Sequence, residues 1–282
     1  MQTVFVGPAP RIALSVHGNG PLVLFLHGIG GNRHHWREQL PIFATRFKAV
    51  AWDARGYGES DDYEGSLKFD DFTSDVLRVL DHFKQQKAHL VGLSMGGRIA
   101  RNFALRHPER VAKLVLANTT PGFDALTPDE VKKFVAERKN RSPESMKALI
   151  SAHARPGAYA DLLESFKALR QPSYLKTLEA SVTQDRAAPI EKIRAPTLVV
   201  TSDEDKVYPP SIARGMVKRI PGARLAVISG AGHLSNLEQP GQFNEVVLRF
   251  LSAQEKQPWH NKESRSSRAL AAASANPRRS RS

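Results

Sequence analysis

The stretch Val91-Gly-Leu-Ser94-Met-Gly-Gly-Arg98 determines how the rest of the chain is interpreted. Around Ser94 it fits the pattern G-x-S-x-G, which is typical of a serine on a sharp turn between a strand and a helix. Such a turn leaves no room for side chains two residues before and after the serine, and glycine has no Cβ. A short buried strand is expected at Ala88-His-Leu-Val91 before the turn, and a helix is expected over 98–107. The sequence therefore predicts that the Ser94 hydroxyl is exposed at the carboxyl end of a parallel sheet.

Apolar runs alternate with amphipathic segments along the chain. Strands buried on both faces are expected at residues 22–26, 47–52, 113–117, 196–201 and 224–228. An antiparallel hairpin over 3–6 and 11–16 precedes them, and apolar residues recur at helical spacing over 69–83 and 243–251. Strands that alternate with helices imply right-handed crossovers. The predicted fold class is therefore α/β, with a doubly wound, mostly parallel sheet.

One long segment interrupts this alternation. Residues 121–194 contain no strand pattern and are rich in charge and proline, which predicts an inserted helical cap. The core domain is then expected to comprise residues 1–120 and 195–252. Residues 253–282 are polar, basic and low in complexity, so they cannot bury enough apolar area to offset their ordering entropy. We expect them to form a disordered tail.

The composition excludes several classes of protein. A chain of 282 residues that is 41% hydrophobic and 24% charged has ordinary globular values. It has no cysteine, which excludes disulfides, thiolate metal sites and a cysteine nucleophile. The N-terminus has no basic region followed by an apolar run, and no segment approaches the roughly 18 apolar residues that cross a bilayer. We therefore expect a cytoplasmic protein with no signal peptide and no membrane partner.

The formal net charge of +13 could suggest nucleic-acid binding. However, the tail after residue 253 has seven basic and two acidic residues and accounts for +5 of it. The densest basic cluster of the remaining chain consists of Lys132, Lys133, Arg138, Lys139 and Arg141. Because no aromatic pattern accompanies this cluster, we interpret it as a solvated helix face and expect no nucleic-acid partner.

A serine hydroxyl needs a general base, which a carboxylate in turn orients. In a sheet of this kind the partners follow in the order serine, acid, histidine, each after a later strand. His233 follows the last predicted strand on a glycine-rich loop, and Asp205 follows the strand before it. Asp203 is the alternative acid, whereas Glu204 is disfavoured because neighbouring side chains point in different directions. The predicted catalytic residues are Ser94, Asp205 and His233.

The same chemistry needs backbone N–H donors for the oxyanion of a tetrahedral intermediate. Met95, directly after the serine, is expected to provide one donor. Ile29 is expected to provide the second from the glycine-rich loop after the strand 22–26. His27 at the start of that loop is interpreted as structural.

Three further positions carry side chains of functional interest. His34 and His35 are adjacent but lack a third ligand nearby, so no metal site is expected. Trp36 is expected to pack at the mouth of the substrate pocket. Arg98 could contact a substrate carboxylate, although a solvated or ion-paired arginine is the preferred interpretation.

Together these motifs resemble the α/β-hydrolase fold superfamily over about residues 1–252. The segments that carry the resemblance are His27-Gly-Ile-Gly-Gly, Asp53-Ala-Arg-Gly-Tyr-Gly-Glu-Ser60, Gly-Leu-Ser94-Met-Gly-Gly, His107-Pro-Glu-Arg-Val111, Pro196-Thr-Leu-Val-Val and Gly-Ala-Gly-His233. Leu116-Ala-Asn-Thr119 and His233-Leu-Ser-Asn-Leu-Glu-Gln-Pro240 are most similar to the branch of 3-oxoadipate enol-lactonases and small carboxylesterases. One departure is Ser202, where the family usually has glycine before the acid.

The resemblance implies a serine hydrolase that cleaves a small-molecule carboxylic ester or lactone without a cofactor. A carbon–carbon bond hydrolase of meta-cleavage products uses the same triad and is the alternative enzyme. A binding protein that uses the pocket without turnover is the alternative from another class. The sequence identifies neither the substrate nor the oligomeric state.

Overall fold

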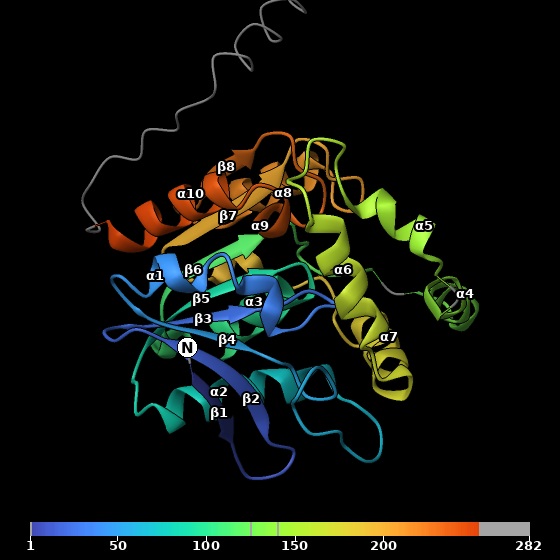
Figure 1. Cartoon of the computed structure of the whole chain (residues 1–282), viewed down its shortest axis with the longest axis horizontal. Helices are drawn as coiled ribbons and strands as arrows, with labels where there is room; N and C mark the ends of the chain where they lie inside the picture. Colours follow the sequence, from blue (N-terminus) through green and yellow to red (C-terminus); the bar gives the residue numbers. More distant parts are fainter. Residues whose placement is uncertain (1, 125, 140, 254–282) are drawn as a thin grey trace, which may run out of the picture.

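A computed structural model describes residues 2–124, 126–139 and 141–253. Its centre is an eight-stranded sheet in the order β1-β2-β4-β3-β5-β6-β7-β8 (Figure 1). The strands are β1 (Gln2–Val6), β2 (Ile12–His17), β3 (Leu22–Leu26), β4 (Lys48–Trp52), β5 (Ala88–Leu93), β6 (Val111–Ala117), β7 (Thr197–Ser202) and β8 (Arg224–Ile228). The pairs β1–β2 and β2–β4 are antiparallel, and all other neighbours are parallel. The predicted α/β fold class with a mostly parallel sheet is confirmed.

Helices cover both faces of this sheet. The α-helices of the core are α1 (Leu40–Phe43), α2 (Phe69–His82), α3 (Met95–Arg106), α8 (Pro210–Arg219), α9 (Ser235–Glu238) and α10 (Pro240–Ser252). Short 3₁₀ helices are η1 (Arg33–Trp36), η2 (Pro108–Arg110), η3 (Lys147–Leu149) and η4 (Ile190–Lys192). Sequence periodicity predicted α2 and α10, and the turn at Ser94 predicted α3, whereas the short helices α1 and α9 are too brief to show a period.

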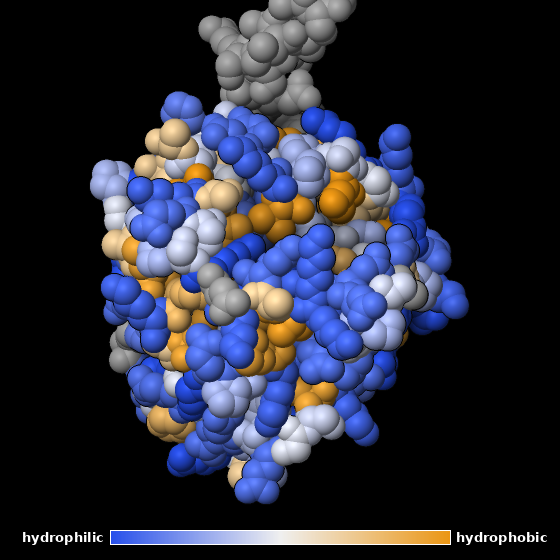
Figure 2. Space-filling view, turned by 90° about the vertical axis from the view of Figure 1, so that its right-hand side faces the viewer, coloured by the Kyte–Doolittle hydropathy of each residue, from blue (hydrophilic) through white to orange (hydrophobic). Residues whose placement is uncertain are grey.

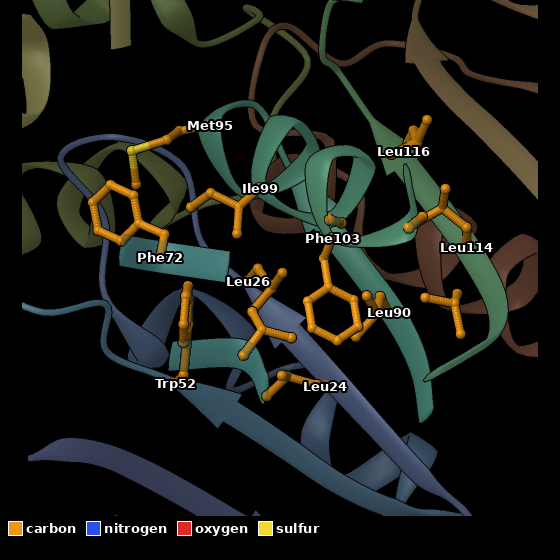
Figure 3. Close-up of a cluster of buried hydrophobic side chains, with 14 of the residues drawn as sticks. Leu24, Leu26, Trp52, Phe72, Leu90, Met95, Ile99, Phe103, Leu114 and Leu116 are labelled. Atoms are coloured by element: carbon orange, nitrogen blue, oxygen red, sulfur yellow. The ribbon is translucent and has the colours of Figure 1, made fainter. Parts of the chain in front are cut away.

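Alternate residues of the parallel strands supply two separate cores. On one face, Leu24, Leu26, Leu90 and Leu114 pack against helices α2, α3 and α8. Figure 3 shows part of this cluster, with Met95, Ile99 and Phe103 of α3 lying over the strands and Trp52 and Phe72 beside them. On the other face, the alternate residues pack against η1, α1 and α10. Burial on both faces explains why the central strands consist mainly of apolar residues.

The segment between β6 and β7 contains the helices α4 (Pro128–Lys139), α5 (Pro143–Met146), α6 (Ala158–Lys167) and α7 (Gln171–Thr183). They lie together at one end of the sheet (Figure 1). An isolated bridge between Phe123 and Arg186 joins the two ends of this segment. We call residues 121–194 the cap. Residues 254–282, where the disordered basic tail is expected, lie outside the described part of the chain.

None of the helices in the described residues is long and apolar enough to cross a membrane.

Candidate active site

The turn at Ser94 has the strained geometry that its glycine-rich sequence predicts. Ser94 has φ 53° and ψ −114°, in the left-handed half of backbone space where few L-residues lie. A Cβ on Gly92 would overlap the carbonyl group of Gly96, and a Cβ on Gly96 would overlap the carbonyl oxygen of Leu26. Helix α3 begins at Met95, three residues earlier than predicted. The serine side chain therefore lies at the junction between β5 and the N-terminus of α3.

Three side chains from three separate loops meet at this junction. His233 Nε2 lies 2.9 Å from Ser94 Oγ, and His233 Nδ1 lies 3.0 Å from Asp205 Oδ2 and 3.2 Å from Asp205 Oδ1. All three are buried, with exposures of 7% for Ser94, 3% for Asp205 and 6% for His233. A carboxylate that accepts from Nδ1–H leaves Nε2 free to take the proton of the serine hydroxyl. The arrangement can thus activate a serine as a nucleophile.

Asp205 and Asp203 have different partners. Asp205 also accepts from the N–H groups of Val207 at 2.8 Å and Tyr208 at 3.0 Å, and from Asn118 Nδ2 at 3.0 Å. Burial opposes ionisation of Asp205, but its hydrogen bond to His233, the charge of His233 and the donors of Tyr208 and Asn118 lower its pKa. An ionised carboxylate is therefore favoured beside the imidazole.

Asp203 faces the loop after β8 instead. Its carboxylate accepts from Ser229 Oγ and from the N–H of Gly230, both at 2.8 Å. Asp203 thus fixes the start of the loop that carries His233, and Asp205 contacts the imidazole itself. Ser202 replaces the glycine that resemblance led us to expect, and its Oγ accepts from Asn118 Nδ2 at 2.9 Å. Ser202 therefore helps to hold Asn118, the residue that also donates to Asp205.

The loop after β3 passes close to the serine. A Cβ on Gly28 would lie only 3.2 Å from Ser94 Cβ, so a glycine permits this approach. The buried His27 fixes the loop, because its Nδ1–H donates to Gly28 O at 2.8 Å and its Nε2 accepts from the N–H of Ala54 at 3.0 Å. Burial lowers the pKa of His27, which favours this neutral form. His27 therefore has the structural role that the sequence suggested.

The expected oxyanion donors belong to the loop after β3 and to the start of α3. Ile29 borders the same cavity as Ser94. Met95 is the first residue of α3, where N–H groups have no acceptor within the helix and the helix dipole favours negative charge.

A cavity of about 210 Å³ opens above Ser94 and His233. Its apolar lining comes mainly from the cap, which contributes Phe123, Phe134, Met146, Leu149, Leu162, Phe166 and Leu178, whereas Ile29, Val207 and Leu234 come from the core. Figure 2 looks onto the side that carries the cap helices, where hydrophilic side chains surround smaller hydrophobic areas. A cavity with mainly apolar walls and polar side chains at defined positions is typical of a small-molecule site.

The expectation for Trp36 is wrong. Its side chain is fully buried and packs against Phe25 and Phe243 with ring centroids 5.0 and 6.0 Å apart. It is not among the residues that line the cavity. Trp36 belongs to the core between the sheet, η1 and α10, because η1 directs its indole inward.

The interpretation of the basic cluster over residues 132–141 as a solvated helix face is wrong for two of its members. Arg138 and Arg141 line the cavity, together with Arg98. Lys132, Lys133 and Lys139 are exposed, as expected. Arg98 is ion-paired, the interpretation that the sequence analysis preferred: its Nη1 lies 3.0 Å from Asp185 Oδ2 and donates to Ser181 O at 2.9 Å.

Within the described residues, no three His, Asp or Glu side chains are grouped closely enough to hold a metal ion. His35 contacts the cap instead, with Nε2–H donating to Ser165 Oγ at 2.8 Å. Burial, more than the neighbouring charges, lowers the pKa of His35 to about 3. A neutral His35 therefore lines the cavity beside the oxyanion loop.

Glu238 braces the histidine loop, a role that was not expected from the sequence. Its carboxylate accepts from the N–H groups on both sides of His233, those of Gly232 at 2.8 Å and Leu234 at 2.9 Å. It also accepts from the N–H of Ser151 in the cap at 2.7 Å. Burial raises the pKa of Glu238 even though these three donors oppose that shift. An acidic residue five positions after the histidine, within a buried helical turn, is the signal that could have identified it.

Glu238→Gln is expected to lower the melting temperature. The amide replaces one acceptor oxygen by an NH₂ group, so one or two buried N–H donors lose their acceptor, at a cost of about 1–3 kcal/mol. In a domain of this size we expect the melting temperature to fall by roughly 2–12 °C, measured by calorimetry. Glu245→Gln removes an exposed carboxylate from α10 and is the matched control. Equal melting temperatures for both variants would contradict the bracing role.

A family model described as the alpha/beta hydrolase fold matches residues 21–240. The chain therefore belongs to the α/β-hydrolase family.

Individual relatives cover most of the chain. It is 26% identical to 3-oxoadipate enol-lactonase 2 of Acinetobacter baylyi over 80% of this chain and 87% of that protein. It is 31% identical to a 2-hydroxy-6-oxononadienedioate/2-hydroxy-6-oxononatrienedioate hydrolase of Burkholderia vietnamiensis over 83% of this chain and 88% of the relative. Among solved structures, a hydrolase from Pseudomonas aeruginosa is similar with a TM-score of 0.77 and 30% identity, over 89% of this chain and 98% of the other.

Proposed function

We propose that the protein is a serine hydrolase that cleaves a carboxylic ester or lactone without a cofactor. The observation that carries this proposal is the contact of His233 Nε2 with Ser94 Oγ at 2.9 Å, made while Asp205 accepts from Nδ1. Ser94 and His233 both line a cavity with mainly apolar walls that is large enough for a small molecule. The similarity to an enol-lactonase supports the choice of bond.

The proposed reaction has two stages. Ser94 Oγ attacks the substrate carbonyl while His233 takes its proton, and the N–H groups of Ile29 and Met95 hold the oxyanion. His233 then gives the proton to the leaving oxygen, and the acyl group remains on Ser94. Water deprotonated by His233 releases the acid and restores the serine. Asp205 keeps the imidazole in the required tautomer throughout and stabilises its positive charge.

A hydrolase of carbon–carbon bonds in meta-cleavage products is the second candidate. Ser94, His233 and Asp205 could catalyse that reaction too, and the similarity to the Burkholderia vietnamiensis hydrolase supports this second candidate. A binding protein without turnover is the third, and the complete hydrogen-bonded triad argues against it.

The test compares three kinds of substrate with the same enzyme preparation. We expect kcat/KM for activated esters and enol-lactones to exceed that for vinylogous diketones at least tenfold. A tenfold or larger preference for the diketones would instead favour carbon–carbon bond cleavage as the function of the protein. No turnover of any of them would favour the binding protein.

A further inference from the structure

The cavity above Ser94 has an excess of positive charge. Three arginines line it, namely Arg98, Arg138 and Arg141, and none of the described residues that line it is an aspartate or a glutamate. A guanidinium stays protonated at every pH of interest, so the charge persists. A site of this kind, partly closed to water, attracts an anion.

Arg98 is only partly neutralised by its own ion pair. Asp185 is its carboxylate partner, but Asp185 also pairs with Arg101. One carboxylate thus faces two guanidinium groups, and all three side chains are at most 3% exposed. In addition, Nε–H of Arg98 has no hydrogen-bond partner among the described residues. The buried group therefore retains one positive charge at the wall of the cavity.

Arg138 comes from the C-terminal end of cap helix α4. Its guanidinium lies 3.4 Å from the centroid of the Phe134 ring and donates to Phe134 O at 3.2 Å. Its carboxylate neighbour is Glu137 at 3.8 Å, which is 57% exposed and lies outside the cavity lining. Burial and the adjacent charge of Arg141 lower the pKa of Arg138. Arg138 and Arg141 thus place two like charges on the wall of one cavity.

We propose that Arg138 and Arg141 bind a carboxylate of the substrate, so that the preferred ester or lactone is an acidic one. This inference rests on the proposed function and narrows its substrate class. An anion between the two guanidinium groups relieves their repulsion and pairs with both of them. Arg98 adds to the positive potential of the same cavity. The cap, and not the core, would then select the substrate.

The first experiment compares matched chromogenic esters. One pair, mono-(4-nitrophenyl) glutarate and 4-nitrophenyl pentanoate, carries the charge in the acyl part. The other, 4-carboxyphenyl acetate and 4-carbamoylphenyl acetate, carries it in the leaving group. We expect kcat/KM to be about tenfold to a hundredfold higher for the anionic member of at least one pair.

The second experiment repeats this comparison with the double variant Arg138→Gln/Arg141→Gln. We expect the preference for the anionic ester to fall at least tenfold, and turnover of the neutral ester to report that the variant is folded. Lys139→Gln is the control, because it removes a charge from the exposed side of the same helix. The preference should be unchanged in that variant. The proposal would be overturned if the enzyme showed no preference for either anionic ester. It would also be overturned if Lys139→Gln reduced that preference as much as the double variant does.

Binding separates this proposal from the proposed function. Ser94→Ala retains the three arginines, so calorimetry with glutarate and 4-hydroxybenzoate tests anion binding without turnover. We expect at least one of them to bind and its Kd to rise tenfold or more when Arg138 and Arg141 are also changed. Binding without any ester turnover by the unmodified enzyme would refute ester hydrolysis and keep the anion site. Ester turnover without binding and without charge preference would refute the anion site alone.

Discussion

Ser94→Ala is expected to lower kcat by about 10⁴-fold or more, with the fold intact. Removing the nucleophile of a serine–histidine–aspartate unit removes nearly the whole contribution of the unit, because its members act together. The residual rate comes from the oxyanion donors and the cavity. The fold should persist because the substitution removes only the hydroxyl oxygen of Ser94, which makes a hydrogen bond with His233.

The measurement is steady-state kinetics of each variant on one activated ester, together with a melting curve. A neighbouring hydroxyl provides the control. Thr119 Oγ1 donates to the carbonyl oxygen of Ser94 at 2.7 Å, so Thr119→Val perturbs the same turn without removing the nucleophile. The decrease in kcat for Thr119→Val should be at least a hundredfold smaller than the decrease for Ser94→Ala. Activity above a tenth of the original in Ser94→Ala would refute the nucleophile.

Asp205→Asn is expected to lower kcat by about 10⁴-fold, and Asp203→Asn by less than tenfold. An amide at 205 keeps the shape but presents an NH₂ group or a neutral oxygen to His233, which favours the wrong tautomer. Asparagine at 203 keeps one oxygen for the contacts with Ser229 and Gly230. Asp203→Asn can therefore affect the imidazole of His233 only through the loop that follows β8.

Both variants are measured on the same ester, with melting temperatures to show that each is folded. Asp205 also accepts from the N–H groups of Val207 and Tyr208, so Asp205→Asn tests shape and charge together. A larger loss for Asp203→Asn than for Asp205→Asn would move the catalytic acid to position 203.

The fold class was accessible from sequence because each of its determinants is local. Strands such as Leu22–Leu26 are apolar throughout, since both faces of the sheet are covered. The glycines beside Ser94 mark positions where a Cβ would overlap the backbone. The order serine, acid, histidine placed three candidates at the ends of separate strands, and the structure brings these side chains within hydrogen-bonding distance. Their catalytic role stays a prediction.

The lining of the cavity was not accessible in the same way. Arg138 and Arg141 looked like solvated helix residues, because only the placement of the cap over the sheet edge turns them toward the cavity. Trp36 followed two histidines in a predicted loop, and nothing local showed that a 3₁₀ helix would turn it into the core. Contacts of Glu238 with Ser151 join residues 87 positions apart, and such long-range pairs have no sequence period.

The covalent attack by Ser94 is the central claim, and reaction with a fluorophosphonate tests it most directly. The intact mass of the protein is measured after incubation, and the modified residue is identified by peptide sequencing in the mass spectrometer. We expect a single adduct on Ser94, none in Ser94→Ala, and much slower labelling in Asp205→Asn. A protein that hydrolyses esters but remains unlabelled at Ser94, or is labelled at another residue, would contradict this account.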